Sequence, residues 1–177
     1  MKITRNPIAL AIAAALLAGG TARAGSVVID ALSIWSATGT VIRTGPDQSV
    51  FAGEVSGPYI VDAGQGPVPA GRIVCVGTVS AEISTGRQSA EGQCQITAED
   101  GATSFARFTC EGLRLVGCAG PFEITGGEGR LEGITGSGRM VVRRSKTEFS
   151  VSGGVLREEG FGVASWDGLT IELPGAD

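Results

Sequence analysis

The chain has 177 residues, with 14 Lys and Arg, 18 Asp and Glu, and no histidine. A net negative charge repels phosphate backbones, so we expect no nucleic acid partner. Without histidine a Ser-His-Asp triad is excluded, and with it the most common general base.

Residues 1–24 have the pattern of a secretory signal peptide. Lys2 and Arg5 precede an apolar run over 8–17, and Ala22-Arg-Ala24 is a small-x-small cleavage site. The apolar run is shorter than the roughly 20 residues of a membrane span, and no cysteine follows it for a lipid anchor. Cleavage after Ala24 would leave residues 25–177 as a single domain without a membrane span. Its formal charge would be 11 − 18 = −7, in the periplasm or the medium.

Short runs with alternating apolar and polar residues dominate the rest of the chain. Thr147–Val151 places Thr147, Phe149 and Val151 on one face, and Leu169–Leu173 alternates in the same way. Period two over such a length indicates a half-buried strand. Candidate strands lie at about 26–31, 34–43, 49–56, 71–83, 90–98, 103–111, 119–125, 138–144, 147–152, 160–166 and 168–173. Many short strands separated by turns predict an all-β fold, an antiparallel β-barrel of about eight main strands behind the signal-peptide helix.

The segment 62–71 is expected to be the longest loop. It contains two prolines and several glycines, which a central strand does not tolerate. We expect it to cover one mouth of the barrel.

The four cysteines, Cys75, Cys94, Cys110 and Cys118, predict two disulfide bonds in an exported chain. Zinc is the competing interpretation, but zinc sites usually use C-x(2–4)-C pairs or histidine. The spacings here are 19, 16 and 8. Disulfides are therefore favoured, and no metal or cofactor is expected.

Turn positions indicate which cysteines pair. A hairpin centred on Ser84-Thr85-Gly86 sets Cys75 opposite Cys94, and one centred at residue 102, after the Asp100-Gly101 turn, sets Cys94 opposite Cys110. Directly opposed residues lie within disulfide reach. Two pairings stay open, Cys75–Cys94 with Cys110–Cys118 or Cys94–Cys110 with Cys75–Cys118. The first is favoured because both bonds close short local returns.

The run from Gly126 to Gly138 is dense in glycine. It contains neither G-x-G-x-x-G in a β-α-β unit nor G-x(4)-G-K-[ST], so a phosphate cradle is not supported. Turns and bulges at barrel corners are the favoured role.

Gly126-Gly-Glu-Gly-Arg-Leu-Glu-Gly-Ile-Thr-Gly136 resembles the "GGTGRFxGITG" run of small secreted bacterial proteins related in fold to allene oxide cyclase and dirigent barrels. Gly92–Gly101 is similar to their "GxCxxTDxDGD" segment, and the resemblance spans about residues 48–140. It implies a calycin-like barrel. Ala98 and Ala102 replace two carboxylates of that pattern, so a calcium loop is not implied. The cyclase activity is not carried over, because fold does not determine function.

Charged pairs offer little sign of catalysis. Glu99-Asp100 and Glu158-Glu159 precede glycines and are interpreted as solvated turn residues, and Glu128 with Glu132 is a third pair. The basic cluster at 143–146 is interpreted as a solvated hairpin end. We therefore assign no catalytic residue.

Trp35, Tyr59 and Trp166 are candidate ligand-lining residues at a barrel mouth, with packing at the barrel end as the alternative. The favoured hypothesis is a non-catalytic module that binds a small apolar ligand or a protein partner. An isomerase or cyclase, by fold analogy, and a structural envelope protein without a pocket are the alternatives. Interior volume and polarity would separate the three.

Overall fold

The structure, a computed structural model, describes residues 25–173. They form a closed barrel of eight antiparallel strands in sequence order, with β8 paired to β1. The strands are β1 (Gly25–Gly45), β2 (Gln48–Asp62), β3 (Val68–Glu82), β4 (Arg87–Ala98), β5 (Thr103–Leu113), β6 (Gly117–Gly127), β7 (Thr135–Ser152) and β8 (Val155–Leu173), with a 3-10 helix, η1 (Gly129–Leu131), before β7. The predicted all-β barrel is confirmed. The predicted signal peptide lies outside the described residues.

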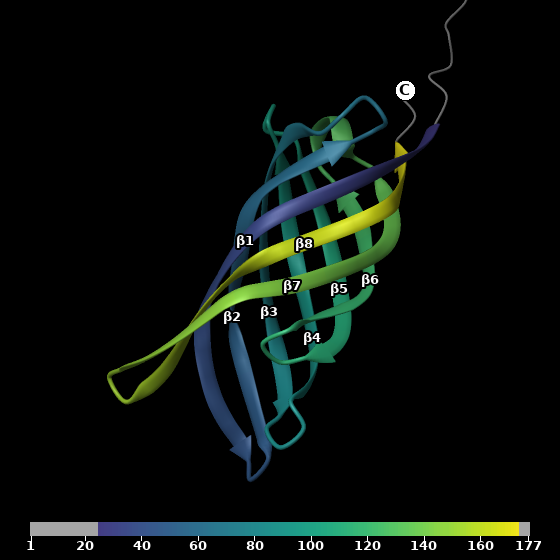
Figure 1. Cartoon of the computed structure of the whole chain (residues 1–177). Coiled ribbons are helices and arrows are strands. Elements are labelled where there is room, and N and C mark those ends of the chain that lie inside the picture. Colours follow the sequence, from purple (N-terminus) through teal and green to yellow (C-terminus); the bar gives the residue numbers. More distant parts are fainter. Residues whose placement is uncertain (1–24, 174–177) are drawn as a thin grey trace, which may run out of the picture.

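The up-and-down order gives the barrel two distinct ends (Figure 1). The β1–β2, β3–β4, β5–β6 and β7–β8 connections lie at one end, which we call the lower end. The β2–β3, β4–β5 and β6–β7 connections, together with residues Gly25 and Leu173, lie at the upper end. The connection through η1 therefore sits at the upper mouth.

Several predicted strands are parts of longer strands. Segments 26–31 and 34–43 are both β1, 138–144 and 147–152 are both β7, and 160–166 and 168–173 are both β8. Register shifts at Ile29/Ala31 and Arg144/Lys146 mark the places where the sequence pattern breaks. A bulge bends a strand and accentuates its twist without ending it, which is why the break in alternation did not indicate a turn.

The predicted loop over 62–71 is shorter than expected. β3 begins at Val68 and includes Pro69, and the register shifts between Tyr59 and Ile60 on the partner strand. Pro69 lies near the start of its strand, beside a bulge, where the missing N–H is tolerated. The longest connection between described strands is instead the one through η1, from β6 to β7.

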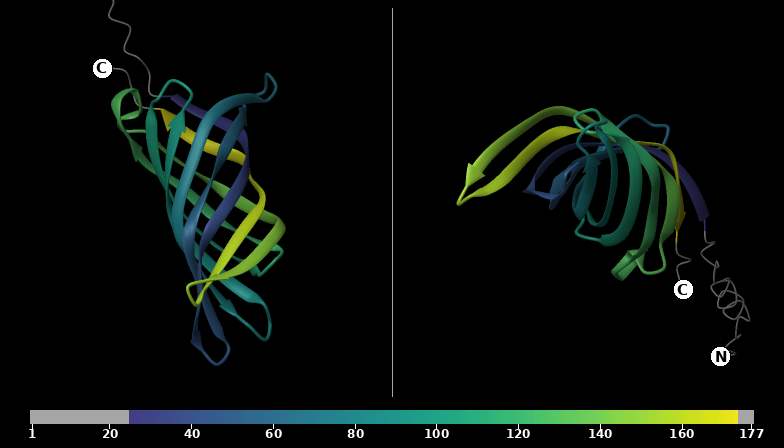
Figure 2. Two further views of the ribbon diagram at one scale, coloured as in Figure 1. Left: turned by 90° about the vertical axis from the view of Figure 1, so that its left-hand side faces the viewer. Right: turned by 90° about the horizontal axis from the view of Figure 1, so that it is seen from below.

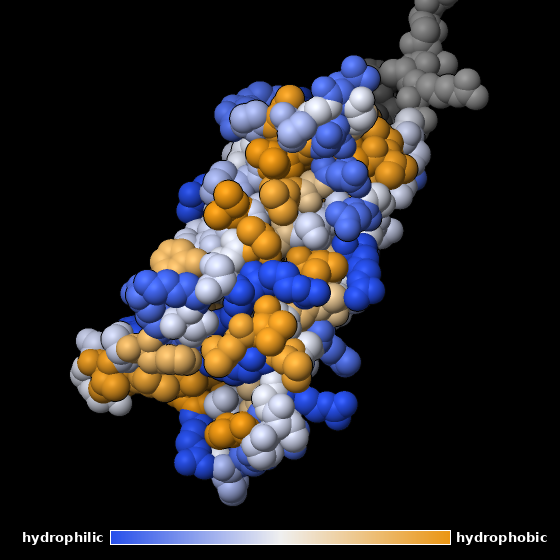
Figure 3. All heavy atoms as spheres, in the orientation of Figure 1, coloured by the Kyte–Doolittle hydropathy of each residue, from blue (hydrophilic) through white to orange (hydrophobic). Residues whose placement is uncertain are grey.

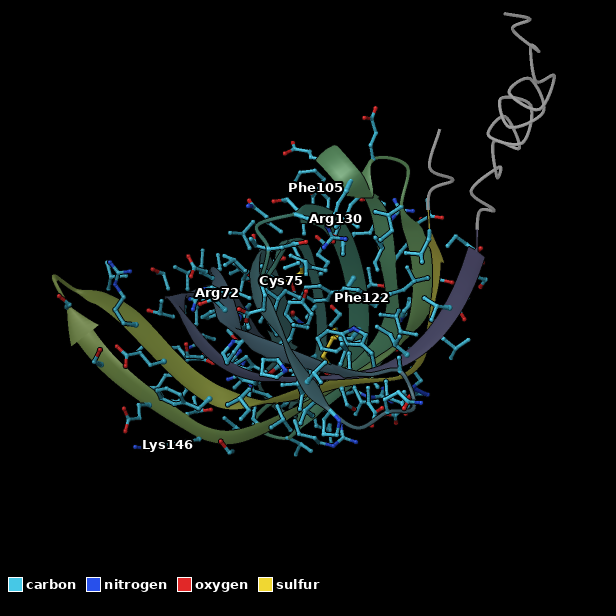
Figure 4. All side chains as sticks on the ribbon, turned by 90° about the horizontal axis from the view of Figure 1, so that it is seen from above. Arg72, Cys75, Phe105, Phe122, Arg130 and Lys146 are labelled. Atoms are coloured by element: carbon cyan, nitrogen blue, oxygen red, sulfur yellow. A yellow bond between two sulfur atoms is a disulfide. The ribbon has the colours of Figure 1, made fainter. Side chains whose placement is uncertain are left out.

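Inward-facing side chains fill much of the barrel. They include Trp35, Phe51, Ile73, Phe122, Met140 and Trp166, all buried. Figure 4 shows Phe122 and Cys75 inside the barrel wall, whereas Lys146 lies far outside it. Gly162 provides the room for Trp35, because a Cβ there would lie 2.6 Å from the indole ring.

Two disulfides lie in this interior, Cys75–Cys94 and Cys110–Cys118, which is the pairing favoured because both bonds close short local returns. Cys75 is directly opposite Cys94 in the β3–β4 register, as the turn at 84–86 predicted. The prediction for the next hairpin was wrong. Cys94 is opposite Ala106 and Cys110 is opposite Ala90, because the turn is centred at residue 100 and not at 102.

Candidate ligand pockets of the barrel

The upper mouth opens into an apolar pocket of about 330 Å³. Apart from Trp166, its polar side chains are those of Tyr59, Ser104 and Arg130. Its walls are mainly aliphatic, and include Ile29, Val61, Ile96, Leu131, Ile134 and Ile171. A cleft of roughly 300–1,000 Å³ with a few polar groups is the usual form of a small-molecule site. We call it the upper pocket.

Tyr59 is the one tyrosine that lines the upper pocket. It lies on β2, next to a shift in the register with β3. Burial raises the pKa of this hydroxyl above 10.0, and the negative charges of Asp100 and Glu99 raise it further. The phenol is therefore protonated at neutral pH, and it offers a hydrogen bond donor in apolar surroundings.

An ion pair links two connections across the upper mouth. Arg130 of η1 donates from Nε and Nη2 to Asp100 Oδ2 of the β4–β5 turn, at 2.7 and 2.6 Å. A hydrogen bond from the Ala102 N–H lowers the pKa of the Asp100 carboxyl, and the hydrogen bond and charge of Arg130 lower it further. Asp100 therefore neutralises Arg130 at the rim of the upper pocket.

A second, smaller cavity of about 100 Å³ lies deeper in the barrel. Ile73, Phe122 and Trp166 line both cavities, so these side chains form the boundary between them. Phe122 and Trp166 pack edge to face, with ring centroids 5.2 Å apart, an arrangement that aromatic pairs favour. Both disulfides line this inner cavity.

A buried charge cluster closes the lower part of the interior. Glu158 of β8 is only 1% exposed and accepts from Arg144 Nη1 at 2.6 Å and from Arg114. Arg144 also lies 5.9 Å from the centroid of the Trp35 ring, within the range of a cation–π interaction. These three residues come from β8, β7 and the β5–β6 turn, which the cluster therefore joins.

This cluster contradicts two sequence-based interpretations. The basic segment 143–146 is not a hairpin end but lies within β7, and Glu158 is not a solvated turn residue but a buried one. The turn that joins β7 and β8 is at Gly153-Gly154. The sequence did contain a signal for the burial of Glu158, because Glu158 is in phase with the inward-facing Ala164 and Trp166. That signal can be recognised only if the strand is taken to start at Val155, as β8 does.

The three predicted aromatic residues do not share one pocket. Tyr59 and Trp166 line the upper pocket, and Trp35 and Trp166 line the inner cavity. The indole Nε1 atoms of both tryptophans are buried and find no acceptor among residues 25–173. Sequence reasoning missed Ser104, Arg130 and the aliphatic walls.

The carboxylate pairs considered for acid–base chemistry are not convergent. Glu99 and Asp100 are exposed in the β4–β5 turn, and Glu128 and Glu132 are exposed on either side of η1. Glu159 is exposed next to buried Glu158. None of these five carboxylates lines either cavity.

Comparisons with known proteins give distant matches to solved structures. No family model matches this chain, and no curated protein matches it. One solved structure of a pterocarpan synthase dirigent protein is 12% identical, with a TM-score of 0.38, and covers 86% of this chain and 94% of its own. A second is 14% identical, with a TM-score of 0.36, and covers 82% of this chain and 95% of its own. With TM-scores this low, neither match supports an argument about the fold or the function of this chain.

Within residues 25–173, no helix combines the length and apolar character needed to span a membrane.

Proposed function

We propose that this protein is an exported, disulfide-stabilised binding module that holds a small, uncharged, apolar ligand in the upper pocket. The observation that carries the proposal is the pocket itself, an apolar space of about 330 Å³ at the barrel mouth. An apolar ligand that enters this mostly aliphatic pocket removes its surface from water. That burial is favourable by about 25 cal/mol for each Å² of apolar surface.

The charges at the rim favour an uncharged ligand. Arg130 is the only charged residue among those that line the upper pocket, and Asp100 already pairs with it. A charged ligand group buried deeper would meet no partner there, which is strongly unfavourable. The Tyr59 and Ser104 hydroxyls leave room for one or two hydrogen bonds to the ligand.

The same lining supports a binding role without catalysis. General acid–base catalysis needs a titratable group within hydrogen bond reach of the reacting atoms. In the upper pocket the titratable groups are a tyrosine with a raised pKa and a paired arginine. The raised pKa of Tyr59 keeps its phenol protonated near neutral pH.

Export is supported by the signal-peptide pattern in residues 1–24 and by the two disulfides, which persist in oxidising compartments. We place the mature protein in the periplasm or the medium, after cleavage behind Ala24.

Native mass spectrometry of protein purified from its own compartment tests the proposal. We expect a retained small molecule that Ala31→Leu displaces, because Ala31 lines the upper pocket and leucine adds three carbons there. Ala52→Leu is the matched control, since Ala52 is exposed. Ligand-free protein in repeated native preparations, together with no binding of apolar probes that depends on Ala31, would contradict the proposal.

A further inference from the structure

The lower parts of β7 and β8, Lys146–Ser152 and Val155–Phe161, form a hairpin whose β8 strand stays paired with β1 as far as Leu156. Figure 1 shows this hairpin projecting at the lower left, and the right-hand view of Figure 2 shows its tip extending beyond the other strands. β6 pairs with β7 only as far as Gly117 opposite Arg143, and one further bond runs from the Arg144 N–H to the Val116 carbonyl. Beyond it, β7 pairs with β8 alone among the described strands. The other edge of β7 is therefore free.

The free edge is apolar on one face. Phe149 is opposite Glu158, which points into the barrel, so Thr147, Phe149 and Val151 continue the inner face beyond the point where the barrel covers it. Phe149 is 52% exposed and Val151 is 72% exposed. Figure 3 shows hydrophobic residues on this projecting end. An exposed strand edge of this kind is a template for pairing with another strand.

The charges of the edge make it complementary to itself. Lys146 and Glu148 are exposed on the opposite face and form an ion pair with each other. If two β7 edges run antiparallel with Thr147 opposite Thr147, each Lys146 lies opposite Glu148 of the second copy. Registers centred on Lys146 or Glu148 would place like charges opposite each other, which is destabilising.

We propose that this edge pairs with the same edge of a second copy of the chain, giving a two-fold symmetric dimer centred on Thr147. Such an isologous contact closes on itself, so it stops at two copies. A lysine on a free edge usually discourages pairing, but in this register its charge meets a carboxylate.

Sedimentation of the mature protein over a range of concentrations tests the pairing. We expect a reversible dimer. Lys146→Glu should raise its dissociation constant on the order of tenfold, because two attractive cross-strand pairs become repulsive. The double variant Lys146→Glu with Glu148→Lys should restore it, since the two charges are exchanged. A monomer at all concentrations, or a dimer that Lys146→Glu leaves unchanged, would overturn the proposal.

Cross-linking tests the register. Under oxidation Thr147→Cys should give a disulfide-linked dimer, because the two copies of residue 147 are directly opposed. Val151→Cys should not, since those positions would lie roughly 26 Å apart at 3.3 Å per residue. Equal cross-linking of the two variants, or none with Thr147→Cys, would contradict this register. Circular dichroism of each variant shows whether the barrel is intact.

Discussion

Glu158 is the residue on which the lower interior depends most directly. Its carboxylate is shared by Arg114 and Arg144, and all three side chains are largely removed from water. Removing one member of a buried ionic cluster leaves the other charges without compensation, which typically costs about 3–5 kcal/mol.

We therefore predict that Glu158→Gln lowers the free energy of unfolding by about 3 kcal/mol, measured by urea denaturation. The neighbouring Glu159→Gln is the matched control, because Glu159 is exposed, and its effect should stay within about 0.5 kcal/mol. Equal effects of the two substitutions would show that the cluster does not stabilise the fold.

Tyr59 allows a direct measurement of the upper pocket, because it is the only tyrosine in the chain. Its pKa is raised above 10.0 by burial and then by Asp100 and Glu99. Ultraviolet titration of the folded protein should give a midpoint above that of the protein in denaturant. Asp100→Asn should lower the folded midpoint. A folded midpoint at or below the denatured one would contradict this environment for Tyr59.

The same shift determines how stability depends on pH at this site. The folded protein binds the Tyr59 proton more tightly than the unfolded chain does. At alkaline pH the unfolded chain therefore loses this proton first, and the free energy of unfolding falls. The contribution of Tyr59 is fully present below pH 10.0 and is lost as the pH rises through the folded pKa. Phe in place of Tyr59 should remove this part of the alkaline decline.

At the scale of elements, the two disulfides connect neighbouring strands, β3 with β4 and β5 with β6. Each closes a short loop, with sequence separations of 19 and 8. In the chain-entropy account, such cross-links stabilise mainly by restricting the unfolded chain.

Replacing Cys75 and Cys94 by alanine should lower the free energy of unfolding by about 3 kcal/mol, and replacing Cys110 and Cys118 by about 2.5 kcal/mol. Urea denaturation of both double variants measures the difference, with the slope of the transition as a check on two-state behaviour. A clearly larger loss for the Cys110–Cys118 pair would indicate that packing in the inner cavity outweighs loop closure.

The turns between elements were also the most predictable local features. Ser84-Thr85-Gly86 and Asp100-Gly101 do connect β3 to β4 and β4 to β5. Turn chemistry depends on a few adjacent residues, so sequence reasoning captures it. The hairpin end predicted at Glu158-Glu159 lies instead at Gly153-Gly154, and the basic segment 143–146 lies within β7, because tertiary contacts bury Arg144 and Glu158.

At the scale of the whole molecule, β1 begins at Gly25, directly after the predicted cleavage site. We predict that protein exported from its own host begins at Gly25, and that alkylation without reduction labels none of its four cysteines. Intact mass measurement checks both. Ala24→Tyr should block processing, because the cleavage site requires a small residue there. A mature protein that retains residues 1–24 would contradict the prediction.

The sequence by itself determined which residues alternate, where several turns fall, and that Cys75 is opposite Cys94. These follow from local geometry, in which side chains two apart share a face. Only the tertiary structure decided what covers each face. The same alternation buries Trp166 but leaves Phe149 exposed. The reason is that β6 begins at Gly117, opposite Arg143, whereas β7 continues beyond Arg143 without this neighbour. Likewise, Glu158 is buried because barrel closure brings to it two arginines that lie 44 and 14 residues away in the chain.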